Sequence, residues 1–394
     1  MTELTQIILK SGKDVALFRL HPWVFSGAIK KIKGPINEGD IVEIVNNKFE
    51  FLGYGHYQIG SIAIRVFSFI EEEINTNFWR KKIELAYNYR KNMNFIEKGK
   101  TNIFRLLHAE GDGMPGMIVD VYNDTAIMQF HSIGMFLMRE ELAKCIVDTV
   151  EEVTSVYSKS EATMPKKSEL EVVDGFIIGE SKAQFALENG LKFYIDWFTG
   201  QKTGFFIDQR ENRELLGSYS KNKSVLNMFG YTGGFSVYAM QEGASLVHSV
   251  DASAKATDLV NMNVKENFPD ATNHEAFTAD AFAYMADIKD QYDIIILDPP
   301  AFAKQRKALH NALQGYKRLN QIALEQIKPG GIIFTFSCSQ VVSKENFRKS
   351  VFAAATNAKR KVRIMHQLTQ PVDHAPSISH PEGEYLKGLV LYVE

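Results

Sequence analysis

The stretch SVLNMFGYTGGFSVYA, residues 224–239, decides the fold of the C-terminal half of the chain. It begins with an apolar run of strand length and continues, after Gly230, Gly233 and Gly234, as a helical pattern. Glycines allow a tight turn and a close approach of a ligand to the backbone, and the first amides of the helix point to the same place. The stretch therefore predicts a strand, a ligand-binding turn and a helix, although such a turn also forms without a ligand.

The same alternation of strand and helix continues through residues 190–394. Further apolar runs stand at residues 245–250, 293–298, 331–338 and 388–393, with helical patterns between them. Short apolar strands between amphipathic helices predict a parallel sheet covered on both faces. Ligands of such sheets lie beyond the C-terminal strand ends, so the chemistry is expected in the residues that follow each strand.

Two acidic residues follow predicted strands. Asp251 comes after Gly234 at roughly the 20-residue spacing at which a carboxylate accepts hydrogen bonds from a ribose. Asp280 ends the next strand and is expected either to contact an adenine or to cap a helix. Together with the glycine turn, these residues favour a cofactor that contains adenosine. The turn is not G-x-G-x-x-G, which argues against a dinucleotide.

The motif DPPAF, residues 298–302, follows the fourth strand. Pro299 and Pro300 fix the backbone and hold the Asp298 carboxylate at a rigid strand end, while Phe302 offers a stacking face for a planar base. Base methyltransferases use an acidic or amide residue followed by two prolines and an aromatic residue in this way. A rigid turn without a ligand is the alternative.

The motif FSCS, residues 336–339, brings Cys338 to the same sheet edge. The only other cysteine, Cys145, lies at helical spacing among apolar residues, so we expect it to pack in a core. A thiolate at position 338 can instead add to C6 of a pyrimidine and make C5 nucleophilic enough to attack an electrophilic methyl group. Asp298 would then hydrogen-bond N3 of the base or protonate it.

Composition restricts the class of protein. The chain has 394 residues, of which 45% are hydrophobic and 23% charged, so it is globular and long enough for two or three domains. Two cysteines exclude a disulfide scaffold and suggest a reducing cytosol, and we expect no signal peptide, no membrane span and no metal site. We divide the chain into residues 1–70, rich in short β-like runs, 71–189, a basic connector and an α+β domain, and 190–394.

Net charge is −2, but the basic residues are clustered, and local charge matters more than the sum for a nucleic-acid partner. One cluster spans residues 78–105. A second follows DPPAF and contains Lys304, Arg306, Lys307, Lys317 and Arg318. Solvated helix faces are the alternative interpretation of both.

With these features, the chain resembles the RlmI type of bacterial 23S rRNA cytosine-5 methyltransferases, whose relatives include RlmK-like guanine-N7 enzymes. HPWVFSGAI, GDIVEIV and FLGYGHY are similar to the PUA domain of that family, and LLHAEGDGMPGMIVDVY to its central domain. Five blocks are similar to the catalytic domain: GQKTGFFIDQRENR, LNMFGYTGGFSVYA, DPPAF, FSCS and PEGEYLKGL. The resemblance implies an α/β fold: a class I Rossmann-like methyltransferase domain preceded by a small β-rich PUA-like domain and a central α+β domain.

The resemblance also implies roles for particular residues. It makes Cys338 the nucleophile and S-adenosyl-L-methionine the methyl donor. Residues implied to lie at the cofactor are Gly230, Tyr231, Gly233, Asp251, Asp280, Phe206, Gln209 and Arg210. Residues implied to contact 23S rRNA are Pro299, Pro300, Phe302, Lys304 and Arg306. The chain departs from the general pattern at Asn227, where many such enzymes have an acidic residue, and DPPAF lacks a second cysteine.

Other functions remain open at this point. A uracil-5 product would use the same covalent chemistry, and a guanine-N7 product would not need Cys338. An NAD-dependent oxidoreductase leaves DPPAF beside a cysteine unexplained, and a non-catalytic RNA-binding protein leaves the glycine turn and Asp251 unexplained. A homodimer is one assembly compatible with the sequence.

Overall fold

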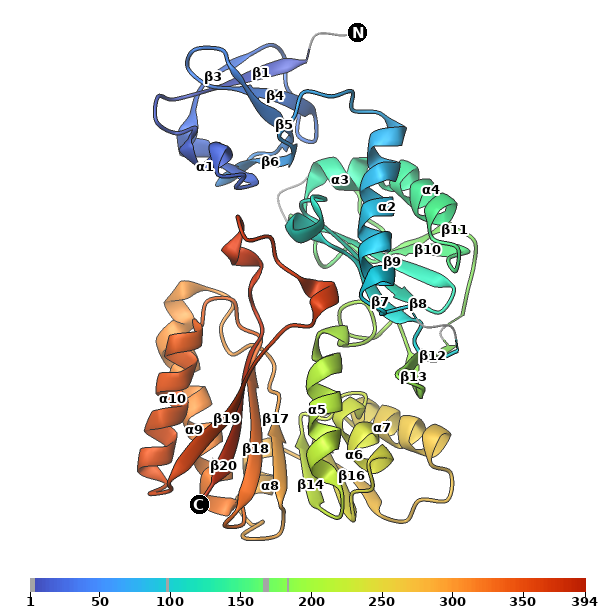
Figure 1. Cartoon of the computed structure of the whole chain (residues 1–394), viewed down its shortest axis with the longest axis vertical. Helices are drawn as coiled ribbons and strands as arrows, with labels where there is room; N and C mark the ends of the chain where they lie inside the picture. Colours follow the sequence, from blue (N-terminus) through green and yellow to red (C-terminus); the bar gives the residue numbers. More distant parts are fainter. Residues whose placement is uncertain (1–3, 97–98, 166–169, 183) are drawn as a thin grey trace. The chain divides into compact units, whose positions relative to one another are not determined.

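A computed structural model describes residues 4–96, 99–165, 170–182 and 184–394 (Figure 1). Contacts divide the chain into two compact units, which are described separately. The first comprises Met1–Ala186, Ile195–Phe205 and Val372–Gly383, and the second comprises Leu187–Tyr194, Phe206–Pro371 and Glu384–Glu394. The three-part division expected from the sequence stays a prediction as to its boundaries. None of the helices in the described part of the chain is long and apolar enough to cross a membrane.

The first unit begins with a six-stranded sheet in the order β2-β6-β5-β4-β1-β3. Its elements are β1 Thr5–Leu9, α1 Val15–Phe18, β2 Trp23–Phe25, β3 Ile29–Lys33, β4 Ile41–Val45, β5 Phe51–Tyr57 and β6 Ile62–Ser68. The sequence of the N-terminus is mostly polar, and no strand was predicted there. β1 forms because Ile7 and Leu9 are fully buried in the core of this sheet.

The remainder of the first unit is a five-stranded sheet, in the order β11-β10-β9-β8-β7, with helices packed on it. The elements are α2 Thr76–Asn92, β7 Ile103–His108, β8 Met117–Tyr122, β9 Thr125–Phe130, α3 Ile133–Leu137, α4 Arg139–Thr149, β10 Ser155–Ser158 and β11 Gly175–Ile178. Cys145 of α4 is 1% exposed within this core, which confirms its packing role. The turn residues Gly111, Asp112, Gly113 and Pro115 between apolar runs predict a hairpin over residues 104–130. The structure has three antiparallel strands there, β7, β8 and β9, instead of two. β12 Gln184–Glu188 and β13 Leu191–Ile195 pair as a separate two-stranded sheet.

The second unit is built on a seven-stranded sheet in the order β16-β15-β14-β17-β18-β20-β19. Its strands are β14 Ser224–Met228, β15 Leu246–Asp251, β16 His274–Thr278, β17 Ile294–Leu297, β18 Gly331–Ser337, β19 Val362–Thr369 and β20 Lys387–Val393. Its helices are α5 Arg210–Ser220, α6 Gly234–Gln241, α7 Ala254–Asn267, α8 Ala281–Met285, α9 Leu309–Gln326 and α10 Lys344–Asn357. Helices α5, α6 and α7 cover one face, and α8, α9 and α10 cover the other (Figure 1).

The direction of one strand differs from the prediction of a parallel sheet. β20 runs antiparallel to both β18 and β19, because it follows β19 without a crossover helix and returns between these two strands. The strand order reverses between β14 and β17, which are parallel neighbours. The switch point of the sheet, where ligands bind in open α/β folds, therefore lies where the glycine turn and DPPAF begin.

Candidate active site

The turn after β14 has an unusual backbone. Phe229 and Tyr231 have positive φ angles of 62° and 46°, and Gly233, at 75°, is also left-handed. The Gly233 amide donates to the Gly230 carbonyl at 2.7 Å, and a Cβ atom at Gly233 would come within 3.0 Å of Val260. Left-handed non-glycine residues are uncommon, and strained backbone collects at functional sites. The turn predicted from the glycines is thus formed directly before α6.

Asp251, at the end of β15, forms a hydrogen bond with the backbone of this turn. Its Oδ2 accepts the Tyr231 amide at 3.1 Å, and its Oδ1 accepts the Ser253 amide at 2.9 Å. A carboxylate offers about four acceptor positions, so these two bonds orient Asp251 and leave acceptor capacity for the two hydroxyls of a ribose. The residues present at the turn therefore fit an adenosine-containing ligand.

The segment after Phe206 is fixed beside the turn by a buried ion pair that the sequence did not reveal. The Phe206 ring lies 5.2 Å from that of Tyr231. Arg213 donates to both carboxylate oxygens of Glu188 at 2.7 Å and to the Phe206 carbonyl at 2.9 Å. A Cβ atom at Gly234 would meet Arg213 Cδ at 2.8 Å, so this glycine is needed for close packing. Arg210, 3% exposed, lies 3.4 Å from Glu188.

Gln209, predicted beside the cofactor, contacts Asp298. Its Nε2 donates to Asp298 Oδ2 at 3.1 Å, while Asn212 Nδ2 donates to Gln209 Oε1 at 2.6 Å. Asn212 therefore orients the Gln209 amide, and the amide in turn holds the carboxylate. No signal in the single sequence linked Asn212 to the site, although it stands in the quoted block GQKTGFFIDQRENR.

The acidity of Asp298 is shifted towards neutral pH. Part of the residue's surface is exposed, but dense packing around the carboxylate raises its pKa to about 7. The negative charge of Asp208 also raises this pKa, while the hydrogen bond from Gln209 and the charge of Arg213 lower it. Tyr385 donates to Asp208 Oδ2 at 2.7 Å and holds that carboxylate in place. Asp298 can thus be protonated or ionised near pH 7, as a proton-transferring group requires.

Cys338 follows β18 and is partly exposed. The side chains of both neighbouring residues form hydrogen bonds that hold this part of the backbone, one to α9 and one to the segment between DPPAF and α9. Ser337 Oγ donates to Tyr316 Oη at 2.9 Å, and Ser339 Oγ donates to the Ala303 carbonyl at 2.6 Å. The Phe302 ring packs at 4.6 Å from Tyr316. The structure therefore brings DPPAF and FSCS together, as the sequence predicted.

Tyr316 links the two predicted catalytic groups electrostatically. Its pKa is raised to about 12, mainly by burial and also by the charges of Cys338 and Asp298, while hydrogen bonds with Ser337 and Phe302 lower it. Both charges therefore act within reach of one phenol. Tyr316 could not be predicted from the sequence, because only the packing of α9 against β17 and β18 places it here.

The other predicted residues of the second unit differ in their exposure to solvent. Asp280 is exposed and caps α8, its Oδ1 accepting the Ala283 amide at 2.9 Å. Pro299 is buried and Pro300 exposed. Lys304 and Arg306 are both exposed, in the segment between DPPAF and α9.

The basic cluster at residues 78–105 differs from the expectation of a surface for RNA backbone contacts. Arg90 is 1% exposed and binds the Asp112 carboxylate through two nitrogens. Arg105 binds the Asp120 carboxylate in the same way, at 2.8 and 2.9 Å. These two charges are neutralised inside the first unit, so the basic surface is smaller than the sequence indicated.

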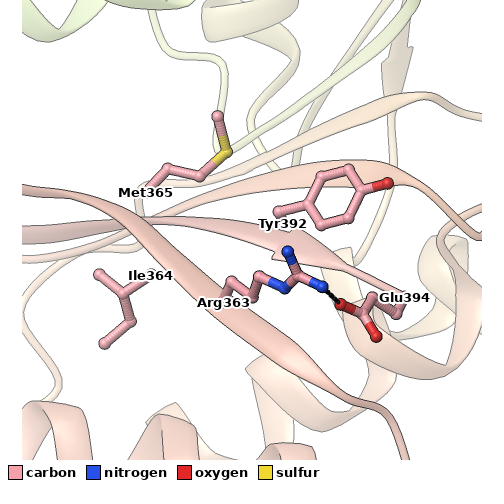
Figure 2. A pocket seen from close by; sticks show the side chains of 5 residues that line it. All are labelled: Arg363, Ile364, Met365, Tyr392 and Glu394. Atoms are coloured by element: carbon pink, nitrogen blue, oxygen red, sulfur yellow. Dashed lines mark ion pairs between the residues drawn. The ribbon is translucent and has the colours of Figure 1, made fainter.

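A hollow at the edge of the large sheet does not belong to this site. Figure 2 shows its lining by β19 and β20, with an ion pair between Arg363 and Glu394. None of the predicted site residues is among the five that line it. The chemistry therefore concentrates at the strand ends and not in this hollow.

Comparison with known proteins agrees with the geometry. Residues 169–374 match the sequence model of a family described as S-adenosylmethionine-dependent methyltransferase, and residues 7–69 match a PUA-like domain. Proteins named ribosomal RNA large subunit methyltransferase I are similar: that of Alteromonas mediterranea is 37% identical over 98% of each chain. That of Tolumonas auensis is 38% identical over 98% of this chain and 99% of its own. A solved protein of Streptococcus mutans, described as a SAM-dependent methyltransferase, shares the fold at TM-score 0.83 and 23% identity, covering 98% and 99% of the two chains.

The fold, the turn and these matches define an S-adenosylmethionine-dependent methyltransferase that carries a PUA-like domain. Within that class, the chain belongs to the family of the ribosomal RNA large subunit methyltransferase I proteins. The fold class, the methyl donor and the family resemblance expected from the sequence are thereby confirmed.

Proposed function

We propose that this protein methylates C5 of a cytosine in 23S rRNA through a covalent bond between Cys338 and C6 of the base. The names of its relatives support large-subunit ribosomal RNA as the substrate. The placement of Cys338 at the same strand-end corner as Asp298 carries the choice of base chemistry. Tyr316, which is affected by the charges of both groups, supports their proximity.

The chain's residues divide the work between cofactor and base. Gly230, Gly233 and Asp251 bind the cofactor, which supplies an electrophilic methyl group when bound. The wall formed by Pro299 and Phe302 receives the base. Because a base inside folded RNA is stacked, the target nucleotide must be flipped out to reach this wall.

Cys338 and Asp298 act on the base together. The Cys338 thiolate forms a bond to C6 while Asp298, protonated below pH about 7, donates its proton to N3. The electron pair of the C5–C6 double bond then becomes available at C5, which bonds to the methyl carbon as that carbon's bond to the donor sulfur breaks. A base next removes the C5 proton, the C6–sulfur bond breaks to release the thiolate, and N3 returns its proton to Asp298, which restores the neutral aromatic ring.

The experiment measures transfer of tritiated methyl from S-adenosylmethionine to protein-free 23S rRNA, with the product nucleoside identified by mass spectrometry. We expect 5-methylcytidine with the wild type and no product with Cys338→Ala, while the variant keeps its cofactor affinity. Formation of 5-methyluridine or 7-methylguanosine would assign a different base. Equal transfer by the variant would reduce Cys338 to a packing residue.

A further inference from the structure

Lys387 is a buried lysine beside the proposed nucleophile. It opens β20, stands opposite Ser337 in the antiparallel pairing of β18 and β20, and is 6% exposed. Lysine is rarely buried, because removing an ammonium ion from water is costly unless other groups stabilise it. Lys387 lies on the strand next to the residue that precedes Cys338, so groups near Cys338 must account for its burial.

The contacts of Lys387 place its charge at the turn that Cys338 begins. Its Nζ donates to the Ser339 carbonyl at 2.6 Å and to the Val342 carbonyl at 2.7 Å. An ammonium group has three donors. The two hydrogen bonds to these carbonyls hold the Lys387 nitrogen at the segment that directly follows Cys338. Both partners are neutral carbonyl groups, which orient the ion without cancelling its charge.

We propose that Lys387 is a positioning residue that holds Cys338 in its thiolate form through an ammonium–thiolate pair. The proposal rests on the proposed function, in which this thiolate attacks C6. In forming the pair, the sulfur–hydrogen bond breaks and the proton passes to solvent water, because Lys387 already carries its own proton at neutral pH, so no further reactant is needed. A nearby cation lowers the pKa of a cysteine and raises the fraction of reactive thiolate at neutral pH.

The electrostatics of the lysine agree with this arrangement. The pKa of Lys387 is lowered to about 8, mainly by burial and also by the charge of Lys344, while the charge of Cys338 raises it. The side chain is thus a cation at pH 7 and becomes neutral as the pH rises through about 8. We therefore expect the stabilisation of the thiolate to be present at neutral pH and to fade above pH about 8.

The test measures alkylation of Cys338 by iodoacetamide between pH 5 and 10 in the full-length protein without RNA. Mass spectrometry of the peptide that contains Cys338 separates it from Cys145. We expect wild-type Cys338 to react with an apparent pKa below the value of about 8.5 for a free cysteine. Lys387→Met should slow alkylation at pH 7 about tenfold or more, and Lys387→Arg, which keeps the charge, should restore most of the rate. The exposed Lys265→Met serves as the control.

Two results would overturn the proposal. One is an unchanged alkylation profile in a Lys387→Met variant that melts within a few degrees of the wild type. The other is an apparent pKa at or above about 8.5 for Cys338 in the wild type, which is informative even if the variant does not fold. A low, Lys387-dependent thiol pKa without methylation of cytosine would instead contradict the proposed function and leave the pair intact.

Discussion

Asp298 illustrates how one residue couples function to stability. Its pKa of about 7 in the folded protein lies far above the ordinary value of 3.8. As the pH rises, the unfolded chain therefore releases this proton first. The contribution of Asp298 to folding stability is full below pH about 4 and is lost as the pH rises through about 7. The ionised carboxylate therefore destabilises the folded protein at alkaline pH.

We predict that Asp298→Asn is more stable than the wild type at pH 8 and gains little at pH 4. Asparagine accepts the Gln209 hydrogen bond without becoming charged, and the gain should be on the order of 1–2 kcal/mol, reduced by the residue's partial exposure. Urea unfolding at both pH values measures it, with the exposed Asp258→Asn as the control. A difference between Asp298→Asn and the wild type that does not change with pH would contradict the pKa shift.

Asp251 carries a prediction about cofactor affinity. Asp251→Ala should weaken S-adenosylmethionine binding about tenfold to a hundredfold, because hydrogen bonds to a charged group contribute roughly 1.5–3 kcal/mol. Isothermal titration calorimetry with the cofactor alone measures this loss. Asp258→Ala, an exposed position on the helix α7 that follows Asp251, should bind normally. Unchanged affinity in a folded Asp251→Ala protein would show that the ribose assignment is wrong.

At the scale of elements, the turn between β14 and α6 combines a strained backbone with the cofactor contacts that we propose for it. Gly233 and Gly243 flank α6, and both have left-handed φ angles, 75° and 83°. A Cβ atom at Gly243 would meet no atom within 4 Å, whereas one at Gly233 would press on Val260 at 3.0 Å. Comparing alanine substitutions at these two glycines therefore separates the energetic penalty of a left-handed backbone from any effect on cofactor binding at the turn.

We predict that Gly233→Ala and Gly243→Ala each destabilise the protein by about 1–2 kcal/mol, the usual penalty of a left-handed alanine. Only Gly233→Ala should also weaken binding of S-adenosylmethionine. Denaturant unfolding gives the first quantity and calorimetry the second. Equal cofactor affinity in the two variants would mean that the turn does not form the binding site.

Much of the second unit could be predicted because its central strands are short and mostly apolar. β14, β15, β17 and β18 follow from this pattern, and the residues after them follow from the rule for parallel sheets. The antiparallel direction of β20 could not be predicted, because it depends on which connection lacks a helix. The pairing of Glu188 with Arg213, and the approach of Tyr316 and Lys387 to Cys338, depend on contacts between distant segments, which one sequence does not record.

At the scale of the whole molecule, the positions of the charged residues matter more for RNA binding than the net charge does. A net charge of −2 would not attract RNA, and Arg90 and Arg105 of the first cluster are neutralised by carboxylates. The exposed residues Lys304, Arg306 and Lys307 remain beside DPPAF. We therefore expect this second cluster to hold the phosphates that flank the target base.

The prediction for RNA binding concerns its dependence on salt. Changing Lys304, Arg306 and Lys307 to glutamine should make the negative slope of log affinity against log salt shallower by about 2. Each lost phosphate contact removes about 0.7 from its magnitude on a single strand. Filter binding of a 23S rRNA fragment over a salt series measures the slope. The exposed Lys265→Gln should leave it unchanged. A slope unaffected by the triple substitution would remove this segment from the RNA interface.

The covalent step is the central claim, and trapping it is the most direct test. An RNA substrate in which 5-fluorocytidine replaces cytidine cannot release a proton from C5, so the adduct with sulfur should persist. After incubation with S-adenosylmethionine, we predict an RNA–protein complex that survives denaturing electrophoresis and maps to Cys338 by mass spectrometry. Cys338→Ala should give no such complex. Methylation of the unmodified RNA without any trapped complex, or a complex at another residue, would contradict the mechanism.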